Sequence, residues 1–135
     1  MEEKEKLIKI VTKQCTQGET EKTVMHTAAK ITGTGDDYSI TYFDEDGDLE
    51  GCETTLHISR GRRISINRRG PFSSHMVIEK SVRHLSHHET PAGSFIMGMS
   101  CKEIDSDFDN GRLHFSYATD VEMVPISDIE FDFEF

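Results

Sequence analysis

The last segment of the chain alternates strictly between apolar and acidic residues. The apolar positions are Ile129, Phe131, Phe133 and Phe135, and the acidic ones are Asp128, Glu130, Asp132 and Glu134. Because successive side chains of a β-strand point to opposite faces, this pattern predicts a strand with one face in a core and one in water. The same period of two recurs in 112–119, 56–58 and 64–66. It is typical of antiparallel sheets with one solvated face.

Turn-forming residues separate these alternating runs. They are Asp46-Gly47, Arg60-Gly61, Arg69-Gly70-Pro71, Pro91-Ala92-Gly93 and Asn110-Gly111. Asp-Gly and Asn-Gly favour the positive φ of tight hairpin turns. The predicted strands are 6–15, 22–33, 37–43, 51–59, 62–68, 73–80, 83–89, 94–104, 112–120 and 126–135. The sequence therefore predicts an all-β fold, an antiparallel closed or nearly closed barrel of about 8–10 strands.

Two segments test this reading. Residues Lys22–Lys30 contain alanines and lysines that tolerate a helix, but their β-branched residues favour a strand. Residues Phe95–Cys101 are apolar on both parities, so we expect a central strand covered on both faces. A short helix or lid over one barrel end would supply that cover.

Length and composition predict a single β-barrel domain over residues 1–135. Hydrophobic residues make up 35% of the chain and charged residues 30%, which suffices for one core. No stretch has the apolar length of a membrane span, and the charged start MEEKEK lacks the apolar run of a signal peptide. We therefore expect a cytoplasmic protein with no membrane partner. Cys15, Cys52 and Cys101 are too widely spaced for a disulfide framework or a zinc knuckle.

The formal net charge is −10, which argues against a nucleic-acid partner, because attraction to phosphates needs a basic surface. The charge is unevenly distributed. Segment Arg60–Arg83 is rich in arginine, and its one carboxylate is Glu79. This segment forms a local basic zone on an acidic chain.

A family resemblance emerges from motifs between Tyr38 and Tyr117. In chain order they are Tyr42, Asp46-Gly47, Thr54-Thr55-Leu56, Ile66-Asn67-Arg68-Arg69-Gly70, Met76-Val77-Ile78-Glu79 and Thr90-Pro91-Ala92-Gly93-Ser94. Their order and spacing resemble the YwiB-like family of uncharacterised bacterial proteins. The resemblance implies a lipocalin-like, calycin-type β-barrel, and it brings no activity, substrate or catalytic residues. His88 and Ala92 depart from the aromatic residues expected around the Thr-Pro-x-Gly turn.

The histidines, acidic residues and serines of the chain give little support to catalysis or metal binding. In a strand, His84 and His88 share a face and His87 points away, whereas a metal site needs three or four converging ligands. The acidic run 44–48 resembles part of a calcium loop but lacks the downstream glutamate and the flanking helices. No G-x-S-x-G motif is present. We therefore expect no metal, no cofactor and no catalytic residue, and favour a non-enzymatic protein.

The arginines suggest a ligand site. Arg62 and Arg68 share parity with the core-facing Ile64 and Ile66, so either could lie at a barrel mouth and hold a carboxylate or phosphate. The further residues expected to line the site are Tyr117, Phe115, Met97 and Met99. The competing interpretation is that Arg68 pairs with an acidic residue at the core edge or extends into solvent.

Three functional hypotheses follow. The first is a barrel that binds a small, partly apolar, anionic molecule. The second is a protein-interaction or structural module with a filled core, and the third is an unrecognised hydrolase or isomerase. A cavity with converging polar groups favours the first, whereas a filled interior favours the second. We also expect a homodimer, formed by pairing of the terminal strand across a two-fold axis.

Overall fold

The computed structural model describes residues 3–44, 51–71 and 73–135, which form ten strands and the turns between them. The strands are β1 (Glu3–Thr16), β2 (Glu19–Gly33), β3 (Asp37–Phe43), β4 (Glu53–Ser59), β5 (Arg63–Arg69), β6 (Ser73–Glu79), β7 (Arg83–Thr90), β8 (Gly93–Asp107), β9 (Arg112–Val121) and β10 (Val124–Glu134). Each predicted segment overlaps one of them. Residues Lys22–Lys30 lie in β2, so the prediction of a strand there is confirmed.

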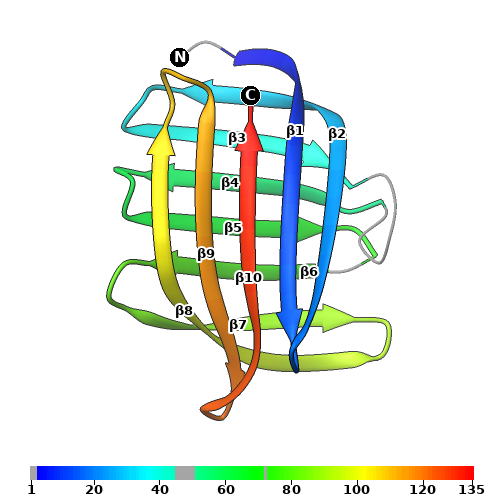
Figure 1. The fold of residues 1–135 in the computed structure, drawn as a ribbon. Helices are drawn as coiled ribbons and strands as arrows, with labels where there is room; N and C mark the ends of the chain where they lie inside the picture. Colours follow the sequence, from blue (N-terminus) through cyan, green and yellow to red (C-terminus); the bar gives the residue numbers. More distant parts are fainter. Residues whose placement is uncertain (1–2, 45–50, 72) are drawn as a thin grey trace.

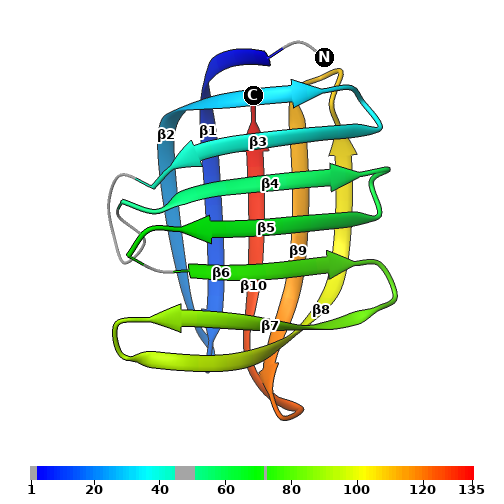
Figure 2. The ribbon, with the colours of Figure 1, turned by 180° about the vertical axis from the view of Figure 1, so that it is seen from behind.

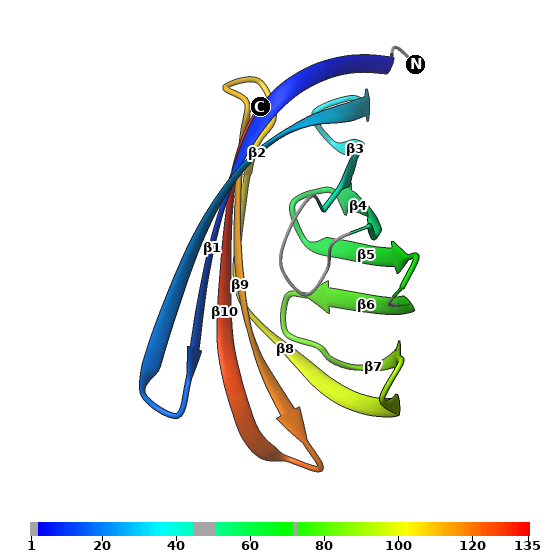
Figure 3. The same ribbon diagram turned by 90° about the vertical axis from the view of Figure 1, so that its right-hand side faces the viewer.

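The strands close into one antiparallel barrel. Each pairs with its neighbours in sequence, and β1 closes the barrel by pairing with both β2 and β10. In Figures 1 and 2, strands β3 to β7 lie horizontally in one layer, and β1, β9 and β10 lie vertically in the other. Figure 3 shows the two layers from the side. The predicted fold class, an all-β closed antiparallel barrel, is confirmed. Within the described residues, no helix is long and apolar enough to cross a membrane.

Inward-facing side chains from both layers fill the interior. The layer of β3 to β7 contributes Tyr38, Ile40, Tyr42, Leu56, Ile58, Ile64, Ile66, Met76 and Ile78, and the opposite layer contributes Ile8, Ile10, Met99, Leu113, Phe115, Tyr117, Phe131 and Phe133. At the centre, the rings of Phe115 and Phe131 stack with centroids 5.1 Å apart. This ring stacking explains why inward positions of the alternating C-terminal segment are phenylalanines.

The start of β8 differs from the expectation of a doubly covered strand. Phe95 is 45% exposed and Ile96 is 49% exposed, whereas Met99 is fully buried. The register explains the difference, because β8 pairs with β9 only from Gly98 onward. Residues 93–97 pair with β7 alone and therefore lie at the edge of the double layer.

The terminal strand is not available for the dimer contact that we expected. Residues Ser127–Glu134 of β10 pair with β9 on one side and with β1 on the other. Their backbone groups are therefore already used, and the predicted pairing of this strand across a two-fold axis is wrong. A homodimer through another surface stays a prediction.

The three cysteines form no disulfide with one another. Residues 45–48 of the acidic run lie outside the described residues.

Candidate functional site

A row of polar side chains crosses the end of the β3 to β7 layer where β3, β5 and β7 finish. These strands point to the same side in Figure 1, and that side faces the viewer in Figure 3. Cross-strand partners follow one another along this row: Tyr42 with Thr54, Thr54 with Arg68, Arg68 with Ser74, Ser74 with His88, and His88 with Phe95. We refer to Tyr42, Thr54, Arg68, Ser74, His88 and Phe95 as the Arg68 mouth.

Arg68 occupies the inward position two residues beyond Ile66, where the strand ends and polar groups reach solvent. Its side chain is partly buried, and its Nε is buried with no hydrogen-bond partner in residues 3–44, 51–71 and 73–135. The predicted alternative, an ion pair at the core edge, is not found among the described residues. A guanidinium is always charged at physiological pH, and leaving one of its donors buried and unsatisfied costs stability. This unused donor is the feature of the mouth that most needs an explanation.

Two buried tyrosines lie within the electrostatic reach of Arg68. Burial raises the pKa of Tyr42, and the nearby Arg68 opposes this rise. Burial also raises the pKa of Tyr117 to about 12, again opposed by Arg68. Both phenols therefore remain protonated at neutral pH. Next to Tyr42, the Thr54 hydroxyl donates to Asp44 Oδ2 at 2.9 Å.

His88 is held at the mouth by a defined hydrogen bond. The Ser86 hydroxyl donates to the carbonyl oxygen of Met97 at 3.2 Å and lies 2.8 Å from His88 Nε2. Because the Ser86 hydroxyl proton is used in the bond to Met97, we infer that His88 Nε2 carries the proton in its contact with Ser86 and donates it to the hydroxyl oxygen. Burial lowers the pKa of His88, and the charges of Arg68 and His87 lower it further, so the ring is neutral at pH 7.

An aromatic stack continues the row beyond His88. The His88 ring lies nearly parallel to Phe95, at an interplanar angle of 7° and a centroid distance of 5.0 Å.

A groove of about 620 Å³ also opens at the end of these strands. Arg68 and Ser74 line it together with residues of the outer barrel face, namely Thr55, Asn67, Arg69, Ser73, His75, His87 and Glu89.

The structure brings together only some of the side chains that the sequence assigned to a ligand site. Tyr117 lies close enough to Arg68 to feel its charge. Phe115 and Met99 are fully buried in the core, and Met97 packs against that core. These residues fill the barrel, so a ligand would have to bind at its mouth rather than in its centre.

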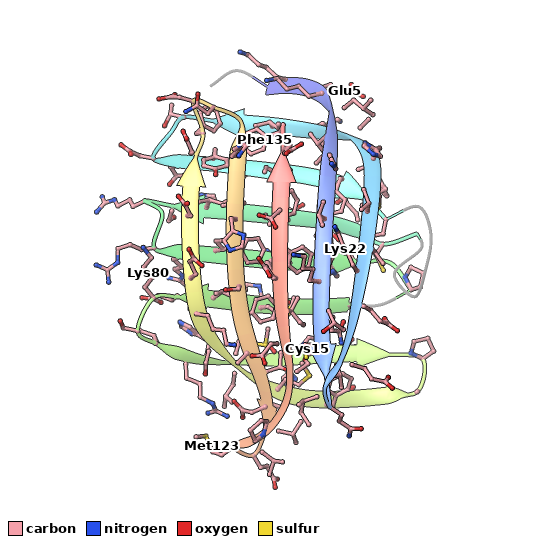
Figure 4. The ribbon with its side chains drawn as sticks, viewed as in Figure 1. Glu5, Cys15, Lys22, Lys80, Met123 and Phe135 are labelled. Atoms are coloured by element: carbon pink, nitrogen blue, oxygen red, sulfur yellow. The ribbon has the colours of Figure 1, made fainter. Side chains whose placement is uncertain are left out.

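Arg62 lies apart from Arg68. It is exposed in the turn before β5, where its carbonyl oxygen accepts a hydrogen bond of 2.9 Å from the backbone N–H of Lys80. Lys80 marks the opposite side of the barrel in Figure 4. The parity that grouped Arg62 with Arg68 does not apply, because β5 begins only at Arg63.

The basic zone is likewise divided rather than forming one patch. Arg69 pairs with Glu53 at 2.8 Å, and Arg83 pairs with Asp120.

Sequence reasoning did not assign Tyr42, Thr54, Ser74 or His88 to a binding site. Their inward parity next to predicted turns was the signal that could have identified them.

A separate polar cluster lies on the outer face of the opposite layer. His114 Nδ1 is 2.7 Å from Asp132 Oδ1 and 3.7 Å from Glu130 Oε1, and its Nε2 is 3.5 Å from Glu103 Oε2. One ligand atom each from His114, Glu130 and Asp132 lies within 4.8 Å of the others. The hydrogen bond between His114 and Asp132 and the attraction of the neighbouring carboxylates account for this arrangement, and they raise the pKa of His114. Of the three histidines first considered for a metal, His84 instead contacts Glu79, at 2.9 Å.

In the part of the chain that the structure describes, fold and mouth together define a ten-stranded antiparallel β-barrel, with an arginine at one end whose Nε is buried without a hydrogen-bond partner. The chain matches the family model described as domain of unknown function DUF1934 over residues 8–132, and it belongs to that family. The crystal structure of ywiB protein from Bacillus subtilis has the same fold, with a TM-score of 0.77 and 17% sequence identity over 98% of this chain and 92% of that chain. The resemblance to the YwiB-like family is thus confirmed. No curated protein sequence matches the chain.

Proposed function

We propose that this barrel is a non-enzymatic binding protein that holds a small, partly apolar anion at the Arg68 mouth. The observation that carries the proposal is Arg68, at an inward position, whose buried Nε has no acceptor among the described residues. An anionic group would supply that acceptor through a charge-assisted hydrogen bond. Phe95 and Met97 offer apolar surface for the rest of the molecule.

The hydrogen-bonding character of the mouth fits an anion better than a cation. The phenols of Tyr42 and Tyr117 stay protonated and are buried beside Arg68, where Tyr42 is hydrogen-bonded with Thr54. The Ser74 hydroxyl lies directly across from Arg68. Carboxylates also lie nearby, namely Asp44, which accepts from Thr54, and Glu89, which lines the same groove as Arg68. Small-ligand sites commonly combine a few convergent polar groups with an apolar lining.

The runner-up is a protein-interaction module, and the filled interior favours it over a barrel that encloses its ligand. Exposed apolar side chains on β7 and around the β9–β10 turn would provide the contact surface. They include Leu85, 67% exposed, Met123, 71% exposed, and Val124, 62% exposed. Met123 marks the tip of that turn in Figure 4.

A thermal-shift screen of small carboxylates and phosphates, each with a neutral analogue, tests the proposal. We expect anions to stabilise the protein more than their neutral analogues. Arg68→Ala should weaken anion binding by about 1.5–3 kcal/mol, the range for charged hydrogen bonds, and leave neutral analogues nearly unaffected. Arg62→Ala removes the same charge from the opposite side of the barrel and is the matched control. Equal losses in the two variants, or no stabilising anion, would overturn the proposal.

A further inference from the structure

The long strand β2 has a neighbour on both edges along only part of its length. Its residues 19–32 pair with β1, whereas its pairs with β3 begin at Ala29. Among the described residues, segment 19–26 therefore pairs with β1 and with no second strand. Figure 1 shows β2 along the outer side of the vertical layer, and Figure 3 shows the end of the β1–β2 hairpin apart from β7. We refer to the side of residues 19–26 that faces away from β1 as the open edge.

The backbone groups of alternate residues point toward the open edge. A two-residue loop, Gln17-Gly18, joins β1 to β2. The residues that flank such a loop exchange backbone hydrogen bonds, and these bonds alternate along the pair, so odd-numbered residues of β2 bond to β1. Beyond the other end of β2, Thr34 exchanges two backbone bonds with Asp37, which gives even-numbered residues the side of β3. The N–H and C=O groups that an added strand would bond thus belong to even-numbered residues, among them Thr20, Lys22 and Val24.

The outward charge at the open edge belongs to Lys22, which lies beside another lysine. Its partner in β1 is Lys13, and the next residue along this row is Glu130 of β10. Like charges directly opposite each other destabilise a strand pair. A carboxylate on an added strand, placed opposite Lys22, would balance the second lysine as Glu130 balances the first. A lysine on an edge also discourages pairing with strands that carry no such charge.

The inward side of the same segment calls for the opposite chemistry. Met25 is half-buried and packs against the core. An added strand would therefore carry acidic residues on its outward parity and apolar residues on its inward parity. Strand β10 has this pattern, and it pairs with the other strand of the hairpin in the same way, with Glu130 opposite Lys13.

A second copy of this chain does not supply such a strand from β2 or β10. When two β2 strands pair across a two-fold axis, outward residues lie opposite outward residues, because directly opposite side chains share a face. The acidic residues of segment 19–26 are Glu19 and Glu21, which have inward parity. Strand β10 carries outward carboxylates, but its residues 127–134 already pair with β1 and β9. The charges therefore favour a different protein as the partner.

We propose that the open edge binds an extended acidic segment of another protein as an added strand. A carboxylate of that segment lies opposite Lys22, and its apolar side chains lie beside Met25. Main-chain hydrogen bonds supply affinity in this mode of recognition, and the alternate side chains supply specificity. The proposal uses no residue of the Arg68 mouth and is independent of the anion site.

Fluorescence anisotropy of the full chain with two labelled peptides tests the charge requirement. The probes are SDIEFDFEF, the sequence of residues 127–135, and its charge-reversed counterpart SKIKFKFKF. We expect the acidic peptide to bind and the basic one not to bind. Lys22→Glu should weaken the acidic peptide at least about 5-fold and allow the basic one to bind, because an attractive cross-strand pair becomes repulsive. Lys80→Glu makes the same charge change on the opposite side of the barrel in Figure 4 and, in about 0.15 M salt, should alter affinity less than about 2-fold.

Amide hydrogen exchange measured by NMR locates the bound peptide. The acidic peptide should slow exchange at the amides of Thr20, Lys22 and Val24 and leave Thr23 unchanged, because the Thr23 amide already bonds to β1. Failure of the acidic peptide to bind, equal affinity for both peptides, or protection elsewhere in the barrel would overturn the proposal. Protection of the same three amides without peptide, together with a dimer mass by light scattering, would assign the open edge to a second copy and would also overturn it.

Discussion

The guanidinium of Arg83 on β7 binds the carboxylate of Asp120 on β9 through two contacts, Nε to Oδ2 at 3.0 Å and Nη2 to Oδ1 at 2.5 Å. The pair spans Gly98 of β8, which lies between these strands. A Cβ on Gly98 would collide with both the Arg83 guanidinium and the Asp120 carboxylate. The absence of a side chain at this position therefore allows the ion pair to form.

We predict that Gly98→Ala lowers the melting temperature of the wild-type protein but has a smaller effect in the Arg83→Ala background. In the wild-type protein the added methyl group breaks the ion pair, whereas in the Arg83→Ala background it displaces only the Asp120 carboxylate, which no longer has that partner. Thermal denaturation of the four proteins in this double-mutant cycle measures the coupling. Additive losses would show that the glycine serves another purpose.

A second glycine is required by a close approach between backbone segments. Gly111 has a φ of +68°, and its Cβ would overlap the carbonyl oxygen of Phe135. Gly18 has a φ of +82° with open space around it, so it is the control for backbone strain alone. We expect Gly18→Ala to cost about 1 kcal/mol of unfolding free energy and Gly111→Ala a further 1–3 kcal/mol, approximately, because it adds overpacking. Urea unfolding measures both, and equal costs would refute the steric argument.

The environment of His114 predicts a pH-dependent contribution to stability. Burial lowers its pKa, but the hydrogen bond to Asp132 and the charges of Asp132, Glu103 and Glu130 outweigh that effect, so the pKa lies above 6.5. A histidine with a raised pKa stabilises the fold fully below its unfolded pKa, and this contribution is lost as the pH rises through the folded value.

His114→Gln should therefore be destabilised relative to wild type most strongly between about pH 5 and 6.5, where the histidine is charged and its carboxylate partners are ionised. The difference should close at higher pH. Urea unfolding across this pH range provides the test, and a difference that grows with pH would contradict it. In Asp132→Asn, the NMR titration of His114 should shift to lower pH.

The local pattern of the sequence was sufficient to predict the strands, because side-chain parity and turn chemistry are properties of short segments. The alternation of Phe131 and Phe133 with acidic residues identified β10 and its buried face. Where a strand begins is less certain, and that uncertainty misplaced Arg62. Because the predicted strand began one residue before β5, it placed the exposed turn residue Arg62 at an inward position.

The mouth itself depends on contacts that the sequence pattern does not encode. Arg68 and His88 are 20 positions apart, and they share one row only through the registers of β5 with β6 and of β6 with β7. Likewise, the exposure of Phe95 follows from the point where β9 begins to pair with β8. Parity placed Arg68 inward, but only barrel closure brings Tyr117 of the opposite layer toward it.

The central claim is that Arg68 is kept for a ligand and not for the stability of the barrel. Urea unfolding of Arg68→Met at pH 7.5 without ligand tests it most directly, because methionine replaces the unbranched stem of the arginine and removes the unsatisfied donor. The account predicts that the variant gains about 1–3 kcal/mol of unfolding free energy, the cost of leaving a buried donor unpaired. Arg62→Met, in the exposed turn, should change stability by less than about 0.5 kcal/mol. A loss of stability in Arg68→Met would show that Arg68 supports the fold and would contradict the account.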